Sequence, residues 1–281
     1  MNIGLGLPIA DPALLTTWAR RADAGPFSTL GLLDRLVYDN PEPLVALAVL
    51  AGATQRVRVQ TEVLLAPLRD TALLAKQAAT LDRMTGGRFT LGLGIGGRAD
   101  DHAATGTDLR ARGRRMDEQL PLLRSLWAGE PFSVDAGPIG PAPARRGGPE
   151  ILIGGFQPPA LERVARWGDG FLCAAPPSWA GGLLDSVRGF WKDHGRTGSP
   201  RLVAQVNVAL GPDDVAAEAH RAMHAYYAFT GMPDRMTAGL LTTPAQIRAA
   251  ISAFADLGAD ELMLYCYALD PDQPARLADL L

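Results

Sequence analysis

Short apolar runs of strand type alternate with amphipathic helical runs from one end of this 281-residue chain to the other. The predicted strands cover residues 3–7, 29–33, 57–65, 89–93, 151–153, 171–174, 202–210 and 262–265. In the run 71–84, Leu74, Ala78 and Leu81 recur at three- and four-residue spacing, as on the buried face of a helix. Eight strands with intervening helices predict an α/β protein with a single closed (β/α)8 barrel, the TIM-barrel fold, over residues 1–281.

Further helix signals support this layout. Asp11 before Pro12 is typical of a helix start, and Thr243 before Pro244 begins a second helix that ends at Gly258. Met116 to Trp127 and residues 213–228 have the same helical spacing. Two segments interrupt the alternation, Ala128–Gly148 and Thr230–Leu241, and we expect both to be insertions that cover a site at the C-terminal ends of the strands.

Composition excludes several classes of protein. The 27 basic and 30 acidic residues nearly balance, which argues against a nucleic-acid surface or a strongly electrostatic membrane site. No apolar run reaches the ~20 residues of a membrane span, and the N-terminus lacks the features of a signal peptide. Cys173 and Cys266 lie in apolar runs without metal or redox spacing, so we expect buried thiols. The sequence predicts a soluble cytoplasmic protein that acts on a small molecule.

Residues at the ends of the predicted strands are the candidates for a functional site, because barrel sites lie at that face. Glycines directly after a strand let the backbone approach a flat or anionic ligand closely. The candidates for catalysis are Asp34, Arg35 and His102, and those for cofactor binding are Glu62, Val63, Gly94, Gly96, Gly97, Arg98, Gly154, Gly155 and Phe156. Gly154 and Gly155 precede a helix start near Pro158, where backbone amides can receive a phosphate. We predict no metal site.

Several phrases of the first 175 residues resemble the luciferase-like family of flavin and deazaflavin oxidoreductases. They are LGLLDRL, TEVLLAPLRD, LLAKQAATLDRMTGGRFTLGLGIGGR, RRMDEQLPLLRSLWAGEPF and PEILIGGFQPPALERVARWGDGF, in the family's order. The resemblance implies a barrel that holds FMN or coenzyme F420 at the strand ends. It also implies a cis peptide bond at Glu62-Val63 that supports the ring of the cofactor, and a homodimer.

The activity that the resemblance implies is oxidation of a small organic substrate with reduced FMN and oxygen, the FMN being supplied by a separate reductase. Hydride transfer with F420 and a cofactor-binding barrel without catalysis are the alternatives. The family usually has Asp-His where this chain has Asp34-Arg35. Arginine does not shuttle protons, but it can hold an anionic group of a cofactor or substrate.

Structural interpretations of the same residues stay open at this point. Gly92, Gly94 and Gly97 satisfy GxGxxG, but the sequence shows neither an immediate helix nor an acidic residue after the next strand. Asp34 could cap a loop at the rim and pair with Arg35. Glu62 could pair with Arg69 or Lys76, and His102 could be a solvated loop residue. His220 and His224 are more typical of an exposed helical pair than of a metal site.

Overall fold

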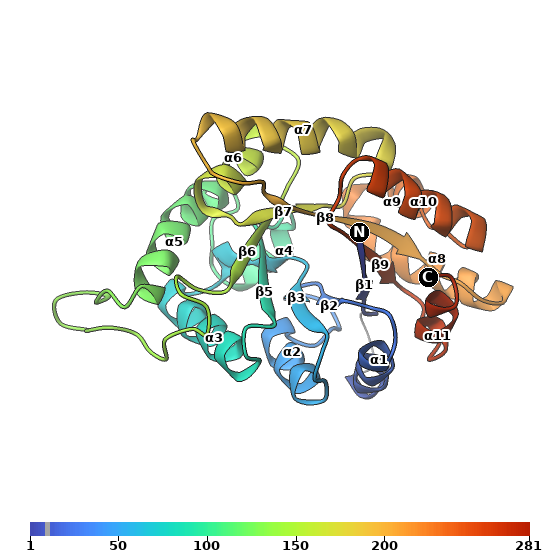
Figure 1. Ribbon diagram of the computed structural model, residues 1–281, viewed down its shortest axis with the longest axis horizontal. Helices are drawn as coiled ribbons and strands as arrows, with labels where there is room; N and C mark the ends of the chain where they lie inside the picture. Colours follow the sequence, from blue (N-terminus) through green and yellow to red (C-terminus); the bar gives the residue numbers. More distant parts are fainter. Residues whose placement is uncertain (9–11) are drawn as a thin grey trace.

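Nine parallel strand segments form one closed barrel in the part of the chain that the structure describes, residues 1–8 and 12–281. This computed structural model has its helices around the barrel (Figure 1). Hydrogen-bonded neighbours follow the order β3, β2, β1, β9, β8, β7, β6, β5 and β4, and pairing of β3 with β5 closes the sheet. The strands are β1 Asn2–Gly6, β2 Thr29–Leu32, β3 Arg58–Thr61, β4 Leu64–Leu65, β5 Phe89–Gly94, β6 Glu150–Gly154, β7 Gly170–Cys173, β8 Arg201–Val208 and β9 Glu261–Cys266. The predicted (β/α)8 barrel is confirmed.

One predicted strand, residues 57–65, is divided. β3 ends at Thr61 and β4 begins at Leu64, and both segments pair with β5. They therefore occupy a single position in the barrel, with Glu62 and Val63 between them. The two residues that interrupt the ladder are the ones for which the resemblance implied a cis bond.

The helices fill the connections between the strands. They are α1 Pro12–Ala24, α2 Pro43–Gly52, α3 Thr71–Met84, α4 Ala99–Ala104, α5 Arg112–Trp127, α6 Pro158–Trp167, α7 Pro177–Asp193, α8 Asp213–Tyr227, α9 Pro233–Thr237, α10 Pro244–Asp256 and α11 Gln273–Ala278, with 3-10 turns η1 Ala66–Leu68 and η2 Ala228–Thr230. Thr243 and Gln246 form a capping box at the start of α10. The predicted cap Asp11 lies outside the described residues. No described helix combines the length and apolarity that crossing a bilayer requires.

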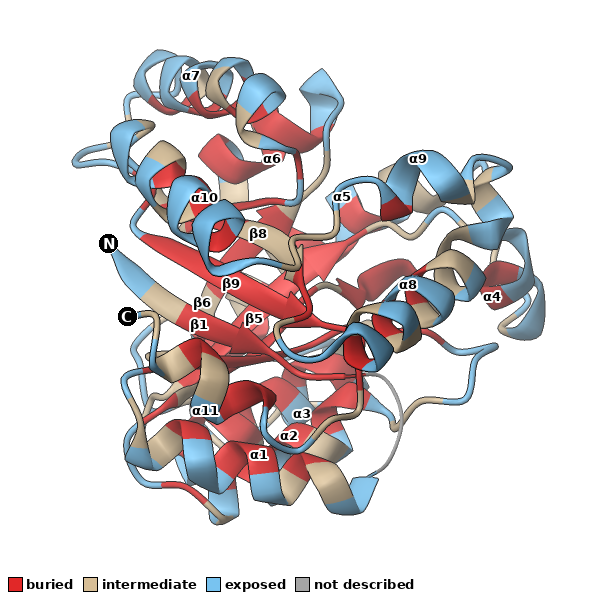
Figure 2. Cartoon of the chain, turned by 90° about the vertical axis from the view of Figure 1, so that its right-hand side faces the viewer, coloured by how far each residue is buried: buried red, intermediate tan, exposed pale blue. Residues whose placement is uncertain are grey.

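The barrel interior is filled by pairing glycines on two strands with large side chains on their neighbours. A Cβ on Gly6 of β1 would lie 2.1 Å from the ring of Tyr265 on β9, and one on Gly31 of β2 would lie 2.5 Å from the carboxyl carbon of Glu62. Figure 2 shows mostly buried strands at the centre and helices whose outer faces are exposed. Glycine is required at these positions because the opposite side chains occupy the space.

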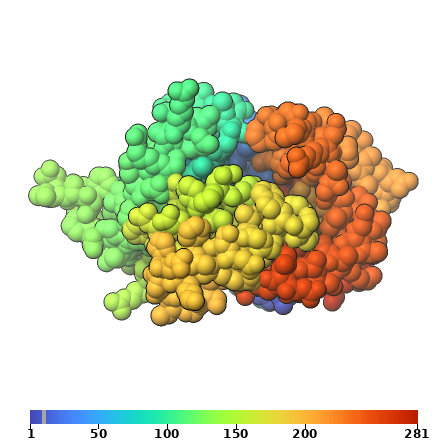
Figure 3. All heavy atoms as spheres, turned by 90° about the horizontal axis from the view of Figure 1, so that it is seen from above, coloured from blue at the N-terminus to red at the C-terminus, as the bar shows by residue number. Residues whose placement is uncertain are grey.

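The excursion Ala128–Gly148 does not cover the strand ends, contrary to the expectation from the sequence. It follows α5 and precedes β6, so it joins a helix to the beginning of a strand at the opposite end of the barrel. Lys76 of α3 donates to its Gly140 carbonyl at 2.8 Å, and Asp82 of α3 accepts from the Ala144 amide at 2.8 Å. The same green to yellow-green segment projects from the side of the molecule in Figures 1 and 3.

Candidate functional site

A cavity of about 430 Å³ lies at the C-terminal ends of β4 to β8. All the predicted cofactor residues except Arg98 line it, and its other walls are largely apolar. The lining residues are Glu62, Val63, Leu65, Gly94, Ile95, Gly96, Gly97, Gly154, Gly155, Phe156, Gln157, Leu172, Cys173, Ala174 and Gln205. The structure therefore brings together segments that lie far apart in the sequence.

Val63 lines this cavity between Gly94 and Gly154. A Cβ on Gly94 would lie 2.4 Å from Val63 Cγ2, and one on Gly154 would lie 2.9 Å from Val63 Cγ1. These two glycines thus make room for a neighbouring side chain, whereas the sequence suggested only room for a ligand. The Glu62-Val63 peptide bond is cis, which confirms the expectation from the resemblance.

A second cavity of about 160 Å³ adjoins the first and shares its floor. Glu62, Val63, Leu65, Gly96 and Gly97 line both cavities. The smaller cavity adds Asp34, Arg35 and Arg98 from the predicted set, together with Leu33, Asp101, Tyr226 and Phe229. Tyr226 and Phe229 come from α8 and η2, directly before the predicted insertion Thr230–Leu241, and no residue of 231–241 lines either cavity.

Asp34 is buried and bound by groups other than Arg35. Its Oδ2 accepts from Arg69 Nη2 at 2.8 Å and from the Leu65 amide at 2.9 Å. The considered pairing with Arg35 is therefore wrong. Asp34 connects the end of β2 to β4, which gives it a positioning role at the cavity wall.

Arg35 is paired with two acidic residues that follow β5. Its Nε donates to Asp101 at 2.8 Å, and its Nη2 donates to Asp100 at 3.3 Å and to the Val37 carbonyl at 3.0 Å. Only Nη1 is buried without a partner among the described residues. The positive charge of Arg35, which we expected to hold an anion, is thus already balanced by Asp100 and Asp101. The remaining hydrogen-bond donor is the Nη1 group.

Arg98 belongs to the smaller cavity and not to the wall at Gly154. Its guanidinium carbon lies 3.6 Å from the ring centroid of Phe229 and 4.8 Å from that of Tyr226, and it also donates to the Tyr226 carbonyl. Arg98, a predicted cofactor residue, therefore lies away from the glycines at which the sequence predicted a phosphate. Instead, Arg98 holds α8 and η2 over the cavity.

His102 is buried behind the glycine turn and lines neither cavity. Its Nδ1 lies 2.9 Å from Thr107 Oγ1, and its Nε2 has no partner among the described residues. The interpretation as a solvated loop residue is wrong. A catalytic role for His102 remains a prediction, and the position of the side chain outside both cavities does not support it.

Glu62 makes neither of the ion pairs that its sequence context suggested. Arg69 is bound to Asp34 and Glu42, while Lys76 donates to Gly140. The Glu62 carboxyl instead accepts from Gln60 Nε2 at 2.6 Å, and its Oε2 is buried without a partner in the described part of the chain. Burial raises the pKa of Glu62 to about 8, although the Gln60 hydrogen bond acts in the opposite direction.

Three consecutive backbone amides are free where the larger cavity meets α6. Within the described residues, the N–H groups of Gly155, Phe156 and Gln157 have no hydrogen-bond acceptor, while Ala160 and Leu161 donate to the Gln157 carbonyl. Pro158 and Pro159 have no N–H groups. The amides available to a phosphate therefore lie before the helix and not in its first turn.

The sequence missed several residues of the site. Asp101, Tyr226, Phe229, Leu172, Cys173 and Gln205 line the cavities but were not among the candidates. Asp101 follows the glycine turn after β5, which the sequence analysis recognised. Its position close to that turn could have indicated that it belongs to the site. Tyr226 lies near the end of the predicted helix 213–228 and Phe229 directly follows that helix, and no motif marked either as a site residue.

The glycine turn after β5 is followed by a helix, contrary to the sequence interpretation. α4 begins at Ala99, two residues after Gly97. The surrounding sheet is nevertheless a closed barrel, whereas the dinucleotide-binding fingerprint belongs to an open sheet. β6, the next strand, ends at Gly154 and not at an acidic residue.

The His220 and His224 pair is not arranged as a metal centre. His224 Nε2 lies 3.4 Å from Asp234 Oδ1. Across the described ranges 1–8 and 12–281, no three His, Cys, Asp or Glu side chains are grouped in a way that could hold a metal ion.

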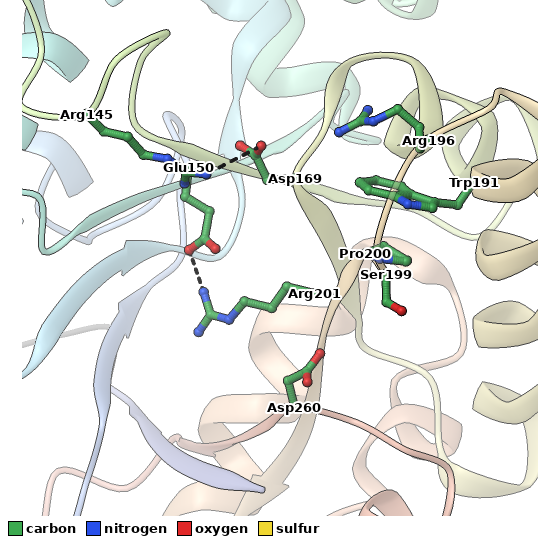
Figure 4. Close-up of a pocket in the computed structure, with 9 residues that line it drawn as sticks. All are labelled: Arg145, Glu150, Asp169, Trp191, Arg196, Ser199, Pro200, Arg201 and Asp260. Atoms are coloured by element: carbon green, nitrogen blue, oxygen red, sulfur yellow. Dashed lines mark hydrogen bonds and ion pairs between the residues drawn. The ribbon is translucent and has the colours of Figure 1, made fainter.

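A further hollow of about 540 Å³ lies at the other end of the barrel, where the strands begin (Figure 4). Its charged groups bind one another: Arg201 pairs with Glu150 at 2.5 Å, and Arg145 lies 3.8 Å from Asp169. Arg196 donates to two backbone carbonyls and lies 3.9 Å from the Trp191 ring centroid. Residues at this face of a barrel serve stability, so the candidate active site is the pair of cavities at the opposite face.

A family model described as luciferase-like monooxygenase matches residues 4–249. The chain belongs to the luciferase-like monooxygenase family. A relative from Streptomyces nodosus subsp. asukaensis, 4-hydroxyprotoasukamycin monooxygenase, is 30% identical over 217 residues, which are 69% of this chain and 58% of the relative. The matched segments cover between half and about 70% of the length of the curated relatives.

Two solved structures have the same fold over nearly the whole chain. An F420-dependent secondary alcohol dehydrogenase in complex with an F420-acetone adduct has a TM-score of 0.80 at 17% identity, with 100% of this chain and 98% of that chain covered. The oxygenating constituent of 3,6-diketocamphane monooxygenase from Pseudomonas putida, in complex with FMN, has a TM-score of 0.79 at 17% identity, with 99% and 95% covered.

Proposed function

We propose that the chain is a flavin-dependent oxidoreductase that oxygenates a small organic substrate with reduced FMN and oxygen. The observation that carries this proposal is the larger cavity at the strand ends, with Val63 at its floor and three free amides at one wall. Membership of the luciferase-like monooxygenase family supports it.

The residues present fit a flavin. The cavity volume of about 430 Å³ lies within the range of small-molecule sites, and Val63, Ile95 and Leu172 offer apolar surface to a flat ring. The amides of Gly155, Phe156 and Gln157 offer hydrogen bonds to a phosphate. Bound reduced FMN would supply the two electrons that activation of oxygen requires.

The chain's own residues then position the reactants and exclude water. Val63 would contact the bound cofactor, and the Arg98, Tyr226 and Phe229 cluster covers the smaller cavity, which is the proposed substrate space. Asp34 and Asp101 hold the surrounding loops through Arg69 and Arg35. Exclusion of water strengthens the hydrogen bonds inside such a site.

Coenzyme F420 is the second candidate cofactor, and the reaction would then be hydride transfer. The solved F420-dependent alcohol dehydrogenase has a barrel of the same fold, which favours keeping this alternative. A barrel that binds the cofactor without catalysis is the third interpretation, because Arg35 stands where the family usually has histidine.

A homodimer and a separate flavin reductase complete the proposal. The outward faces of α2 and α3 expose Val45, Val49 and Leu73, with exposed fractions of 65%, 59% and 56%. A second copy of the chain would bury this apolar surface. The free, buried Cys173 and Cys266 are consistent with a cytoplasmic location. Sedimentation of the purified chain tests the dimer, and a monomer at micromolar concentration would contradict it.

Binding measurements test the cofactor. Cofactor-free protein is titrated with oxidised FMN, reduced FMN and F420, and we expect reduced FMN to bind most tightly. Tighter binding of F420 would replace oxygenation by hydride transfer. Binding of a cofactor without consumption of oxygen or any alcohol or ketone in a substrate panel would support the non-catalytic barrel. Binding of none of the three would overturn the proposal.

A further inference from the structure

Glu62 lies at the floor shared by the two cavities. It is the residue before Val63, and it lines both the larger and the smaller cavity. Its side chain is directed into the barrel, where its carboxyl group rests against the backbone of Gly31. The residue therefore borders both the proposed cofactor space and the proposed substrate space, with its Oε2 buried.

The carboxyl group has no cation as a direct partner. Gln60 on its own strand donates to Oε1, and Oε2 is buried and unpartnered among the described residues. The charged and titratable groups that face it from other strands are Glu261 and Tyr265 on β9 and Arg201 on β8. Burial has the largest effect and Glu261 adds to it, so the pKa is raised to about 8 and the neutral acid predominates at pH 7.

The other titratable side chains that line the cavities are less suited to donating a proton. Asp34 and Asp101 are held in ion pairs with Arg69 and Arg35. Burial raises the pKa of the Tyr226 phenol and of the Cys173 thiol above their ordinary values. Arginine side chains remain protonated in proteins and do not serve as acids. Glu62 is thus the neutral acid available at this face of the barrel.

We propose that Glu62 is the general acid of the site and donates its carboxyl proton to the oxygen atom that leaves as water. This inference rests on the proposed function. With two electrons and one hydrogen from the monoanion of reduced FMN, which would become oxidised FMN, one atom of O₂ would form a bond to the substrate as the O–O bond breaks. The second oxygen atom leaves as water with that hydrogen and the Glu62 proton, and the carboxylate regains a proton from solvent. Such a group provides the proton transfer for which the family's histidine is missing.

The first test measures protonation in the cofactor-free protein. Infrared spectra of the parent and of Glu62→Gln are recorded from pH 5 to 10, with Glu118→Gln on the exposed face of α5 as the matched control. We expect the parent and the control to share a protonated-carboxyl band that titrates near pH 8 and is absent from Glu62→Gln. A parent that already lacks this band at pH 6 would overturn the inference.

The second test compares turnover as a function of pH. We expect Glu62→Gln to bind reduced FMN but to lose activity at pH 7 by about 10²-fold or more, as for loss of a general acid. The parent should lose activity above about pH 8, Glu62→Gln should lack that decline, and Glu62→Asp should recover part of the rate. A comparison of thermal unfolding shows whether each variant is folded.

The two proposals fail in different ways. If the parent binds and turns over FMN while Glu62→Gln keeps the parent's rate and pH profile, only the general-acid role is overturned. If no cofactor binds to the parent, the proposed function is overturned in the binding measurement, whatever the infrared titration shows. If Glu62→Gln does not fold, the parent and Glu62→Asp are compared instead. The general-acid role is overturned if the activity of both has the same pH profile and neither loses activity above pH 8.

Discussion

Asp101 of α4 and Arg35, which follows β2, form a buried ion pair in which Arg35 Nε lies 2.8 Å from Asp101 Oδ2. The other oxygen of Asp101 accepts from the amides of Leu36 at 3.1 Å and Val37 at 2.7 Å. One carboxylate therefore holds the loop after β2 against the helix inserted after β5, although the two residues are 66 positions apart.

Replacement of Asp101 by asparagine should destabilise the protein strongly. Asparagine can still accept from the backbone amides, but it leaves the buried Arg35 without its main counter-charge. Breaking a buried pair in this way costs about 3–5 kcal/mol. Urea unfolding at pH 7 measures the loss. The double variant Arg35→Met with Asp101→Asn should recover much of it, and a cost below about 1 kcal/mol for Asp101→Asn alone would contradict the assigned role.

Gly96 and Gly97 form a matched pair for testing the glycine turn. Gly96 has φ +70°, and its added Cβ would lie 3.2 Å from His102 Nε2, whereas a Cβ on Gly97 meets nothing within 4 Å. We expect Gly96→Ala to lower the free energy of unfolding by about 1 kcal/mol or more, and Gly97→Ala to change it little. Denaturant unfolding of both variants checks this. Equal losses would mean that backbone conformation does not distinguish the two sites.

A phosphate at the start of α6 should respond to the charge of residue 157. Gln157 is exposed and lines the cavity beside the free amides, so its substitution disturbs no packing. We expect Gln157→Glu to weaken FMN binding by about five- to tenfold, roughly 1 kcal/mol, while riboflavin binding stays unchanged. Gln157→Lys is the control of opposite charge. Equal losses for FMN and riboflavin would place the phosphate elsewhere.

Gly155 is a poorer position for that test than its sequence context suggests. Its φ is +152°, and an added Cβ would lie 2.6 Å from the Cβ of Ala160. Gly155→Val would therefore strain the fold in addition to crowding a ligand, so lost binding would not identify a phosphate.

The stability of the protein should reflect the buried Glu62 carboxyl. Its folded-state pKa is raised to about 8 from an ordinary value of 4.5, so the folded protein binds more protons between these pH values. The stability contributed by Glu62 is complete below about pH 4.5 and is lost as the pH rises toward 8. The difference in unfolding free energy between the parent and Glu62→Gln should fall by up to about 1.4 kcal/mol per pH unit across this range. A difference that is independent of pH would exclude a neutral Glu62.

The alternation of strand and helix runs was sufficient to predict the barrel. In most runs, the spacing of apolar residues indicates both the type of element and the face that is buried. α3 agrees with its predicted bounds, Thr71–Met84. α2 was not found because PLVALAVLAG is apolar on every side and has no helical period. Val45 and Val49 on its outward face are exposed to solvent in the single chain. In the proposed dimer a second copy covers them, so this face is apolar and the helix lacks the usual alternation of apolar and polar residues.

The parts of the site that are formed by backbone turns could be predicted from the sequence. The hydrogen-bond and ion-pair partners of its side chains could not. The glycine turns after β5 and β6 could be read from the sequence, and the cis bond followed from the resemblance. The partner of Arg35 could not be predicted, since Asp34, Asp100 and Asp101 carry the same charge and only the fold selects between them. The same holds for Arg98, which contacts Tyr226 and Phe229 in a segment that has no motif.

The position of the Ala128–Gly148 excursion makes it suitable for labelling or immobilising the protein. Val134 near its tip is fully exposed, and a single antiparallel bridge between Pro131 and Pro138 holds the loop's base in the described structure. Because the excursion lies at the end of the barrel where the strands begin, a fluorophore or an immobilisation tag at Val134 would leave the entrance to both cavities open. The protein can thus be fixed to a sensor surface by the end opposite to its chemistry.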